Sequence, residues 1–435
     1  MSKFQSPKGT RDFLPEEMIK RQYIIDTVRN IFERFGFQPL ETPAFESWEL
    51  LSAKGGGGEA IKNEIYYFKD KGDRELGLRF DLTVPLARVI ASNPQLPKPF
   101  KRYQIQQVWR YDNPQSGRYR EFWQADVDIV GSASMDCEAE CLAVAGSVLM
   151  NLGFNEYSIR LNNRKILNIL LSFAGVEKDD EPAVFRILDK FEKAGREETL
   201  KELGRVIGER KASDILGFID LKGRPEELIE KIRKKLGGLS EADEGIKELE
   251  GIAEKAKAYG IRNISIDLSL VRGLDYYTGP IFEISIKAKK NVGSVAGGGR
   301  YDSLVALYGG QPTPCAGFSF GIDRLYDIME SEGMLDMSKI KTKVLVASVN
   351  ESLRNDAIGI ARNLRENGIN AETDLMGRPL RKQLDYANSA GMPYVIVVGE
   401  KEMKENAFHL KDMKTGKEER MNLESIIKRL KMQEG

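Results

Sequence analysis

Two neighbouring segments that alternate polar and apolar side chains constrain the fold of this chain more than any other feature. Residues 102–112 read RYQIQQVWRYD and residues 121–131 read EFWQADVDIVG, and both have the composition and alternation of strands. The connecting loop, NPQSGRYR, bears arginine. The pair therefore predicts two antiparallel strands joined by a long, basic loop.

Further strands and helices are predicted before and after this pair. Residues 17–36 space apolar side chains by three and four, which predicts an amphipathic helix, and the extended segment FQPLETPAFE follows. Residues 64–83 indicate two strands joined by a Lys-Gly-Asp turn, and helices are predicted near 83–92 and 136–152. The glycine run at 55–58, taken alone, predicts a flexible loop.

The middle of the chain changes character. Residues 165–260 are rich in lysine and glutamate with helical spacing, which predicts an inserted helical module. Strands are expected to resume at 264–277 and 280–286. The segment AGGGRYDSL, 296–304, is interpreted as a glycine-rich turn that opens a helix, and residues 317–329 predict a strand running into a helix.

The last segment, from about Lys341, alternates strand and helix patterns. This order predicts a small domain with a mainly parallel core sheet. No GxGxxG follows its first strand, so a dinucleotide site is not expected. The fold class of the whole chain is therefore α/β, with an α+β part built on an antiparallel sheet flanked by helices.

Charge and terminal sequence set few limits on partners. Lysine plus arginine number 66 and aspartate plus glutamate also number 66, so the net charge is zero. A neutral chain still binds nucleic acid through a local basic face. The N-terminal residues lack the apolar core of a signal peptide, and no stretch approaches the roughly 18 apolar residues of a membrane span. We expect a cytoplasmic protein that does not bind a membrane.

Histidine and cysteine content removes several mechanisms. The single histidine, His409, argues against a Ser-His-Asp triad and a histidine-rich zinc site. Cys137 and Cys141 lie four residues apart in a helical stretch, and two thiolates without further ligands make a poor zinc site. We interpret these two residues, Cys315 and His409 as structural, in a reducing compartment.

Three arginines stand in unusual contexts. Arg110 ends a predicted strand, Arg272 precedes a glycine and Arg324 opens a predicted helix. Arginine is always charged and offers planar, bidentate donors to phosphate, so three on one antiparallel sheet can hold a triphosphate. By spacing alone, solvated or ion-paired arginines are the commoner interpretation.

At these residues the chain resembles a known family. The helix ending in FQPLETPAFE, the stretch VWRYDNPQSGRYREFWQ and the stretch GFSFGIDRL are similar, in order, to the three motifs of class II aminoacyl-tRNA synthetases. LVRGLDYYTG, AGGGRYDSL, KGTRDFLPEE and LRFDLTVPLAR resemble the histidyl-tRNA synthetase family in particular. The resemblance covers essentially the whole chain.

The resemblance implies a domain organisation. It implies a catalytic domain with a class II antiparallel sheet, interrupted by the helical insertion and followed by an anticodon-binding domain. The expected parts are residues 1–164 and 261–340 for the catalytic domain, 165–260 for the insertion and 341–435 for the anticodon-binding domain.

The resemblance also implies the residues that bind ATP. Arg110 and Arg272 would be catalytic and contact the α-phosphate, while Phe122 and Arg324 would sandwich adenine. The ATP-binding residues implied in this way are Arg110, Asp112, Arg118, Phe122, Arg272 and Arg324. Magnesium would be held mainly through the phosphates of ATP, which is a substrate, and no zinc is expected.

A second group is implied for the amino acid. Asp81, Thr83 and Gln124 would hold the α-amino group, and Asp128 with Tyr277 would read the imidazole. Many family members carry glutamate where Asp128 stands, so the shorter carboxylate has less reach. The histidine-binding residues implied are Asp81, Thr83, Arg110, Gln124, Asp128, Arg272, Tyr276 and Tyr277. Each also has a plain interpretation: the tyrosines as packing and the aspartates as surface acids.

The expected partners are histidine tRNA, L-histidine, ATP and a second copy of the chain. The residues implied for tRNA are Gln115, Arg118, Arg120, Arg378 and Arg381. Three alternatives stay in view: a synthetase-like regulatory subunit of histidine biosynthesis, a synthetase for another amino acid such as threonine, proline or glycine, and a pure tRNA-binding module. The C-terminal domain argues against the regulatory subunit, and the tyrosine pair argues against a synthetase for another amino acid. The set of arginines argues against a pure tRNA-binding module.

Overall fold

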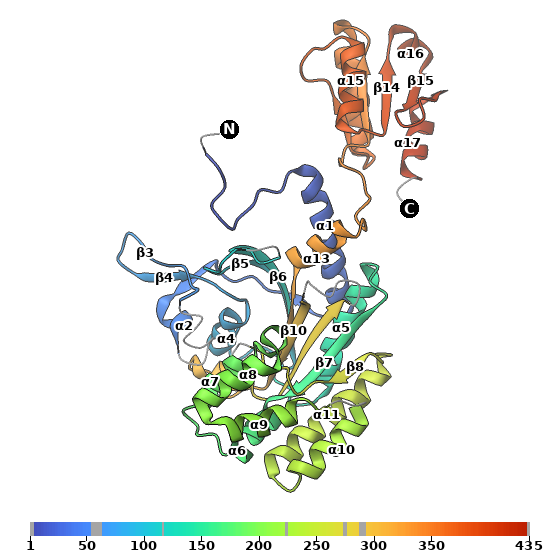
Figure 1. The fold of residues 1–435 in the computed structure, drawn as a ribbon. Coiled ribbons are helices and arrows are strands. Elements are labelled where there is room, and N and C mark those ends of the chain that lie inside the picture. The colour runs from blue at the N-terminus through green and yellow to red at the C-terminus, as the bar shows by residue number, and fades with distance from the viewer. Residues whose placement is uncertain are drawn as a thin grey trace. The chain divides into compact units, whose positions relative to one another are not determined.

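The computed structural model describes residues 4–53, 63–114, 117–221, 225–272, 276–286 and 293–432. The glycine run at 55–58 and Gln115 lie outside these residues. The chain divides into two compact units, the first formed by residues 1–12 and 23–334 and the second by residues 13–22 and 335–435 (Figure 1). Each unit is described by itself.

The first unit is built on a large sheet of eight strands within the described residues. The order across the sheet is β1-β5-β6-β11-β10-β9-β7-β8, and all inner pairs are antiparallel, whereas β1 and β8 join the edges in parallel. The strands are β1 (Gln38–Pro39), β5 (Phe100–Trp109), β6 (Glu121–Val130), β7 (Tyr157–Asn163), β8 (Ile264–Ile266), β9 (Pro280–Ile286), β10 (Ser294–Arg300) and β11 (Cys315–Gly321).

Strands β5 and β6 confirm the antiparallel pair expected from the sequence. Their register places Phe100 opposite Val130 and Trp109 opposite Glu121, so the pairing continues over ten residues of each strand. In this region the alternation of side chains places one set on each face of the sheet. The central position of β6, between β5 and β11, gives it a full set of neighbours on both sides.

Two sequence expectations in this sheet are wrong. The glycines of AGGGRYDSL do not form a turn: they lie inside strand β10, between β9 and β11. The strand expected over 264–277 stops at Ile266, because Asp267 accepts hydrogen bonds from the backbone N–H and hydroxyl of Ser269 and starts a turn. Tyr276 and Tyr277 therefore lie on a connecting segment and not on a strand.

Helices pack on this sheet and anchor its ends. Helix α5 contacts β6, β10 and β11, and α13 contacts β6 and β11. A fully buried ion pair, Arg300 Nε to Glu138 Oε1 at 2.7 Å, fastens the end of β10 to α5. Among the described residues, the helices of the first unit outside 164–258 are α1 (Pro15–Arg34), which belongs to this unit from residue 23 on, α2 (Trp48–Ser52), α4 (Thr83–Ser92), α5 (Asp136–Asn151), α12 (Leu304–Leu307) and α13 (Ile322–Ser331).

The described residues between 164 and 258 form mainly helices, as their spacing predicts, and they belong to the first unit (green and yellow-green in Figure 1). Helix α11 packs against α5, α6 and α10 and also contacts β7 and β9. The helices are α6 (Arg164–Phe173), α7 (Glu181–Leu188), α8 (Phe191–Ile207), α9 (Glu209–Ile219), α10 (Pro225–Leu236) and α11 (Ser240–Ala258).

A small antiparallel sheet completes the first unit. Among the described residues it has the order β2-β4-β3, and β3 and β4 form the hairpin expected around the Lys-Gly-Asp turn. Its strands are β2 (Phe45–Ser47), β3 (Tyr67–Lys69) and β4 (Glu75–Leu78). Phe45, Tyr67 and Phe68 are exposed on it.

The second unit confirms the alternating pattern from about Lys341. Its described strands have the order β13-β12-β14-β15-β16, with a parallel core and an antiparallel hairpin at one edge. The strands are β12 (Val344–Ser348), β13 (Ala371–Thr373), β14 (Tyr394–Val398), β15 (Phe408–Asp412) and β16 (Glu418–Met421). The helices are the 3-10 helix η1 (Glu351–Leu353), α14 (Arg354–Glu366), α15 (Leu380–Ala390), α16 (Glu400–Glu405) and α17 (Leu423–Lys431).

Within the part of the chain that the structure describes, no helix has the length and apolar character that crossing a membrane requires.

Candidate active site

Glycines on two adjacent strands leave room for functional side chains on one face of the large sheet. A Cβ atom on Gly297 of β10 would lie 1.6 Å from Nη1 of Arg272. A Cβ atom on Gly317 of β11 would lie 2.1 Å from Oδ1 of Asp128. Both side chains thus lie directly over backbone that carries no side chain. Glycine is required at these positions by close approach, and not by an unusual backbone angle.

Beside the glycines, a row of buried acids and amides follows strand β6. Asp126 and Asp128 point from β6 to the same face and are each 2% exposed. Gln124, two residues earlier, donates from Nε2 to Oγ of Ser319 at 2.7 Å. Asp81, in the segment before α4, is 3% exposed and accepts from the backbone N–H of Val84 at 3.1 Å. We name Asp81, Gln124, Asp126 and Asp128 the acceptor row.

The acceptor row has unsatisfied capacity. Among the described residues, buried side-chain oxygens without a hydrogen bond include Oδ2 of Asp81, Oε1 of Gln124, Oδ1 of Asp126 and Oδ2 of Asp128. Oδ2 of Asp128 is nevertheless ion-paired, at 2.6 Å from Nη2 of Arg102. Buried polar atoms in folded proteins nearly always have partners. A row of unpaired acceptors therefore suits a ligand that brings several N–H donors.

Burial changes the acidity of these carboxyl groups. It raises the pKa of Asp81 to about 6, although the Val84 N–H, Arg110 and Arg102 act against it. It raises the pKa of Asp126 to about 7, opposed mainly by Arg102. The pKa of Asp128 is also raised by burial and lowered in part by Arg102. A nearby cation favours the ionised form of all three, so a cationic ligand binds here with its charge compensated.

Tyrosines close one side of the row. The ring centroids of Tyr276 and Tyr277 are 4.8 Å apart, and Tyr276 lies 5.7 Å from Tyr301. The hydroxyl of Tyr301 donates to Oδ1 of Asp128. Tyr276 hydrogen-bonds Thr83, and burial raises its pKa, so it remains a neutral donor. The plain interpretations of Asp81 and Asp128 as surface acids are wrong, because both are buried.

Arginines gather beside the row. Nε of Arg110 donates to the carbonyl of Phe80 at 2.9 Å, and its guanidinium lies 5.3 Å from the ring of Phe122. Arg118 pairs with Asp112 at 2.7 Å. Arg324 donates to the carbonyl of Ser294, and its electrostatic neighbours include Glu283, Arg118 and Arg110.

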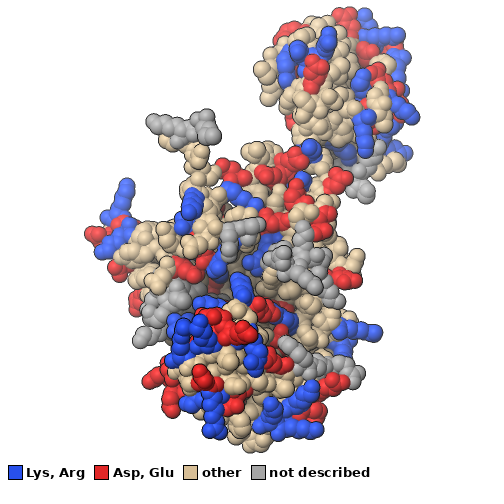
Figure 2. Space-filling view, in the orientation of Figure 1, with Lys and Arg blue, Asp and Glu red and all other residues tan. Residues whose placement is uncertain are grey.

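Crowding of like charge is evident at Arg324. Burial lowers its pKa, and repulsion from Arg118 and Arg110 lowers it further, while Glu283 acts in the opposite direction. Three guanidinium groups close enough to repel one another form a site for a polyanion. Figure 2 shows Lys and Arg atoms within the hollow on this face of the first unit.

Arg272 lies beside Tyr277 and has Glu283 as an electrostatic neighbour in common with Arg324. Its backbone adopts φ 62°, a left-handed conformation that is uncommon for residues other than glycine. Its Nη1 is 3.4 Å from the carbonyl of Phe282 and 3.6 Å from Oε1 of Glu283, and the guanidinium lies 5.6 Å from the ring of Tyr277. Strain of this kind persists where surrounding contacts hold it, and it is frequent at functional sites.

Arg11, in the N-terminal segment, contacts the elements that carry the arginines of the site. Arg11 pairs with Asp323 and with Asp327, each at 3.1 Å, and its guanidinium lies 4.3 Å from the ring of Tyr119. Asp323 in turn accepts from the backbone N–H of Trp123 at 2.7 Å. Arg11 thus joins the loop after β5, strand β6 and the first turn of α13.

The remaining predicted residues are placed as follows. Arg120 donates to the carbonyl of Asp112 at 3.0 Å and lies 4.2 Å from the ring of Tyr111, so its contacts shape the loop. Arg378, in the second unit, pairs with Asp374 at 2.5 Å and lies 4.1 Å from the Tyr386 ring. Arg381 is exposed on the first turn of α15.

The cysteines and the histidine lie apart from this chemistry. Cys137, Cys141 and Cys315 are buried free thiols, and burial raises the pKa of each. His409 lies on β15 in the second unit, 3.7 Å from Glu402. In the ranges that are described, no three His, Cys, Asp or Glu side chains converge as metal ligands would.

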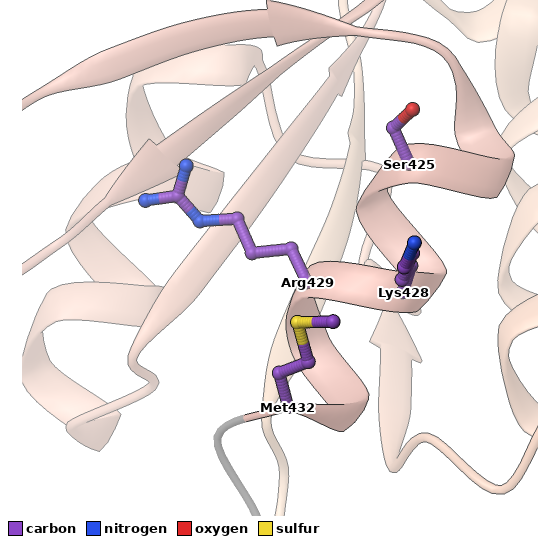
Figure 3. A pocket seen from close by; sticks show the side chains of 4 residues that line it. All are labelled: Ser425, Lys428, Arg429 and Met432. Carbon is purple, nitrogen blue, oxygen red and sulfur yellow. The ribbon is translucent and has the colours of Figure 1, made fainter.

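A surface hollow on α17 of the second unit offers different chemistry. It is lined by Ser425, Lys428, Arg429 and Met432, and Figure 3 shows the two basic side chains extending from α17. Arg429 is ion-paired with Glu419. Its lining has neither the buried acids nor the tyrosines of the acceptor row, so it is a poor candidate for an amino acid site.

Sequence reasoning missed several residues of the site. Arg102, Ser319 and Tyr301 contact predicted residues, and none of the three is predicted from the sequence. The same is true of Asp126, an electrostatic neighbour of Asp128, and of Arg11, which contacts the loop after β5 and helix α13. Alternation along β6 was the signal that could have found Asp126, because it shares a face with Gln124 and Asp128.

Comparison with known proteins gives a consistent result. Residues 9–325 match the family described as Histidyl-tRNA synthetase, and residues 343–433 match the family described as Anticodon binding domain. The chain is 38% identical to a Histidine--tRNA ligase of Thermococcus kodakarensis over 99% of both chains, and 40% identical to one of Gloeobacter violaceus over 95% of this chain and 96% of that one. A crystal structure of histidyl-tRNA synthetase from Nostoc sp. PCC 7120 superposes with a TM-score of 0.86 at 29% identity and covers 100% of both chains.

Proposed function

The chain belongs to the histidyl-tRNA synthetase family, and from that premise we propose how its residues bind the substrates and promote the reaction. The family reaction has two steps: histidine and ATP form histidyl-adenylate and pyrophosphate, and the histidyl group then passes to tRNA. The observation that carries the residue assignments is the acceptor row with its unpaired oxygens, lying beside a group of arginines.

The α-ammonium group of histidine binds at Asp81, Thr83 and Gln124. Asp81 is buried with one unpaired oxygen, and Gln124 has an unpaired amide oxygen, so both accept from an ammonium group. Thr83 is tied to Tyr276 and fixes the segment that carries Asp81. Charge-assisted hydrogen bonds of this kind are stronger than neutral ones.

The imidazole ring binds between Asp128 and the tyrosine pair Tyr276 and Tyr277. A carboxylate accepts from one ring N–H, while a tyrosine hydroxyl serves the other ring nitrogen. The tyrosine rings supply flat apolar walls that suit the imidazole faces. Asp128 is already oriented by Tyr301, which compensates for its short side chain.

ATP binds across the arginines. Arg110, Arg118 and Arg324 compensate the phosphate charge, and Phe122 with Arg324 sandwiches the adenine ring. Asp112 holds Arg118 in place by its 2.7 Å ion pair. Magnesium enters with ATP and is held mainly by the phosphates, and no zinc takes part.

Arg272 and Arg110 are the catalytic residues. The histidine carboxylate is already ionised, so attack on the α-phosphate needs no general base. Arg272 lies over Gly297, within reach of both substrate groups, and stabilises charge that develops at phosphorus. Catalysis therefore depends on positioning and on preorganised charge, which is consistent with a chain that has a single histidine outside this site.

The second unit and the loop after β5 serve tRNA. We assign anticodon binding to residues 341–435, with Arg378 and Arg381 as contacts, and acceptor-stem binding to Gln115, Arg118 and Arg120. The catalytic domain comprises 1–164 and 261–340, with the helical insertion at 165–260. The chain works as a homodimer, and the exposed apolar strands β2 and β3 are surfaces that a second copy can cover.

The direct test is ATP–pyrophosphate exchange with each of the twenty amino acids in turn. Histidine alone should support exchange. Selectivity follows from the acceptor row, because an apolar side chain would leave its buried acceptors unpaired. Equal exchange with a second amino acid would refute the assignment of the row as the histidine site.

A further inference from the structure

The side chain of Arg102 is completely buried, and the proposed function gives it no role. It lies on β5 with 0% exposure, directly opposite Asp128 on β6. Burying a guanidinium group without compensation is costly, so arginine is almost never fully buried unless it is paired. A residue of this kind in the middle of a binding face calls for a functional explanation.

The contacts of Arg102 reach both halves of the histidine site. Its Nη2 lies 2.6 Å from Oδ2 of Asp128 and 3.2 Å from the carbonyl oxygen of Leu82. Its Nη1 lies 3.3 Å from Oε1 of Gln104. Leu82 lies between Asp81 and Thr83, so one guanidinium group links the ammonium-binding segment to the carboxylate that reads the imidazole.

Asp128 is held from two sides. Arg102 contacts Oδ2, and the hydroxyl of Tyr301 donates to Oδ1. Gly317 on the neighbouring strand leaves the space that the carboxylate occupies. An aspartate has one methylene fewer than glutamate, so its reach depends on how firmly its orientation is set.

We propose that Arg102 is a positioning residue for histidine selection, which keeps the carboxylate of Asp128 ionised and directed at the imidazole. It acts through Asp128 and Leu82 and does not touch the substrate. The inference rests on the proposed function, because it assumes that Asp128 reads the imidazole ring.

The charged and titratable groups that face Asp128 support this role. They come from Arg102 on β5, Asp126 on β6, Asp81 before α4, Tyr301 after β10, Cys141 on α5 and Cys315 on β11. Arg102 lowers the pKa of each of the three aspartates against the effect of burial. Removing it leaves three buried carboxyl groups without this cation, so the pKa of Asp128 would rise further and its ionised form would be less favoured.

The experiment compares the wild type with Arg102→Met, which keeps the volume, and Arg102→Lys, which keeps the charge. Michaelis constants for histidine and ATP are measured by pyrophosphate exchange between pH 7 and 9.5. We expect Arg102→Met to lower kcat/KM for histidine about 100-fold at pH 7, the size of effect expected when one buried polar group loses its partner. The KM for ATP should change less than about threefold, a change below 1 kcal/mol.

The pH profile separates this role from a structural one. In Arg102→Met the rise of kcat/KM for histidine should move to higher pH, by at least about one unit, so that activity partly recovers at pH 9.5. Arg102→Lys should restore most of the activity at pH 7. If Arg102→Met does not fold, the double variant Arg102→Met/Asp128→Asn, which leaves no unpaired charge from this pair, replaces it. Because Arg102 acts through Asp128, the pH profile of the double variant for histidine should match that of Asp128→Asn alone.

The outcomes are distinct. Overlapping pH profiles for Arg102→Met and the wild type, or equal effects on both substrates, would overturn the role of Arg102. A shift of the pH profile in the double variant relative to Asp128→Asn would do the same. If the wild type itself lacked histidine-specific exchange, the proposed function would fail instead.

Discussion

The substitution Gly297→Ala tests the geometry of Arg272, the arginine that we propose to be catalytic. The added methyl carbon would lie 1.6 Å from Nη1 of Arg272, 2.6 Å from its Cζ and 3.0 Å from its Nη2. Ordinary van der Waals contact begins near 3.4 Å. The guanidinium group must therefore retreat from β10 by about 2 Å, and such a shift removes it from the reacting phosphorus.

The size of the effect follows from that displacement. A misplacement of about 1 Å costs on the order of 100-fold in rate, and loss of one preorganised donor costs about 100- to 1000-fold. We expect the first-order rate of histidyl-adenylate formation to fall by about 100- to 1000-fold. The free energy of unfolding should change by less than about 1 kcal/mol, because the displaced atoms belong to the end of a flexible side chain.

The assay is single-turnover formation of histidyl-adenylate, measured for Gly297→Ala, Arg272→Ala and the double variant. If the methyl group acts only through Arg272, the double variant should match Arg272→Ala within about threefold. Near-normal adenylation by Gly297→Ala, or losses that multiply in the double variant, would refute the reasoning. Gly298→Ala is the matched control: its Cβ would lie 2.1 Å from the backbone oxygen of Gly317, so it should destabilise the fold.

Three further predictions follow from the same site. Tyr277→Phe and Asp128→Ala should raise the KM for histidine at least about tenfold more than that for ATP, and equal effects in pyrophosphate exchange would favour a packing role. Asp126 has a folded pKa near 7 against an unfolded value of about 3.9, so its folded state loses stability as pH rises between these values. Asp126→Asn should therefore gain stability over the wild type from pH 5 to pH 8 in urea unfolding, and a constant difference would contradict this burial effect. Removing residues 335–435 should reduce charging of full-length tRNA much more than histidine-dependent pyrophosphate exchange, and gel filtration should first show that the oligomeric state is unchanged. Equal losses in the two assays would contradict the proposed division of tRNA binding and activation between the two units.

The sequence predicts the strands of the site well, because alternation reports which side chains share a face. The pair β5 and β6 and the strand running into α13 were predictable from local pattern alone. The glycines of β10 were not, since a run of three glycines usually marks a turn. Their reason lies in another part of the chain: Arg272, more than twenty residues earlier, crosses the strand at Gly297.

Buried charge is the feature that local pattern hides most completely. A charged residue in a strand is expected to face solvent, and the sequence gives no reason to expect otherwise of Arg102. In the fold, however, its side chain is fully buried. Its partner, Asp128, is far from it in the chain and opposite it in the sheet. Only the strand register shows that the two charges compensate each other.

The acceptor row is costly to the free enzyme, and we propose that this cost is the basis of selectivity. Burial raises the pKa of Asp81, Asp126 and Asp128, which shows that their ionised forms are disfavoured without a ligand. Each unpaired buried acceptor costs about 1–3 kcal/mol. A ligand with an ammonium group and a ring N–H removes several of these penalties together, whereas an apolar amino acid leaves those facing its side chain in place. Two unpaired acceptors are then sufficient for discrimination of about 100-fold or more, without a separate editing site.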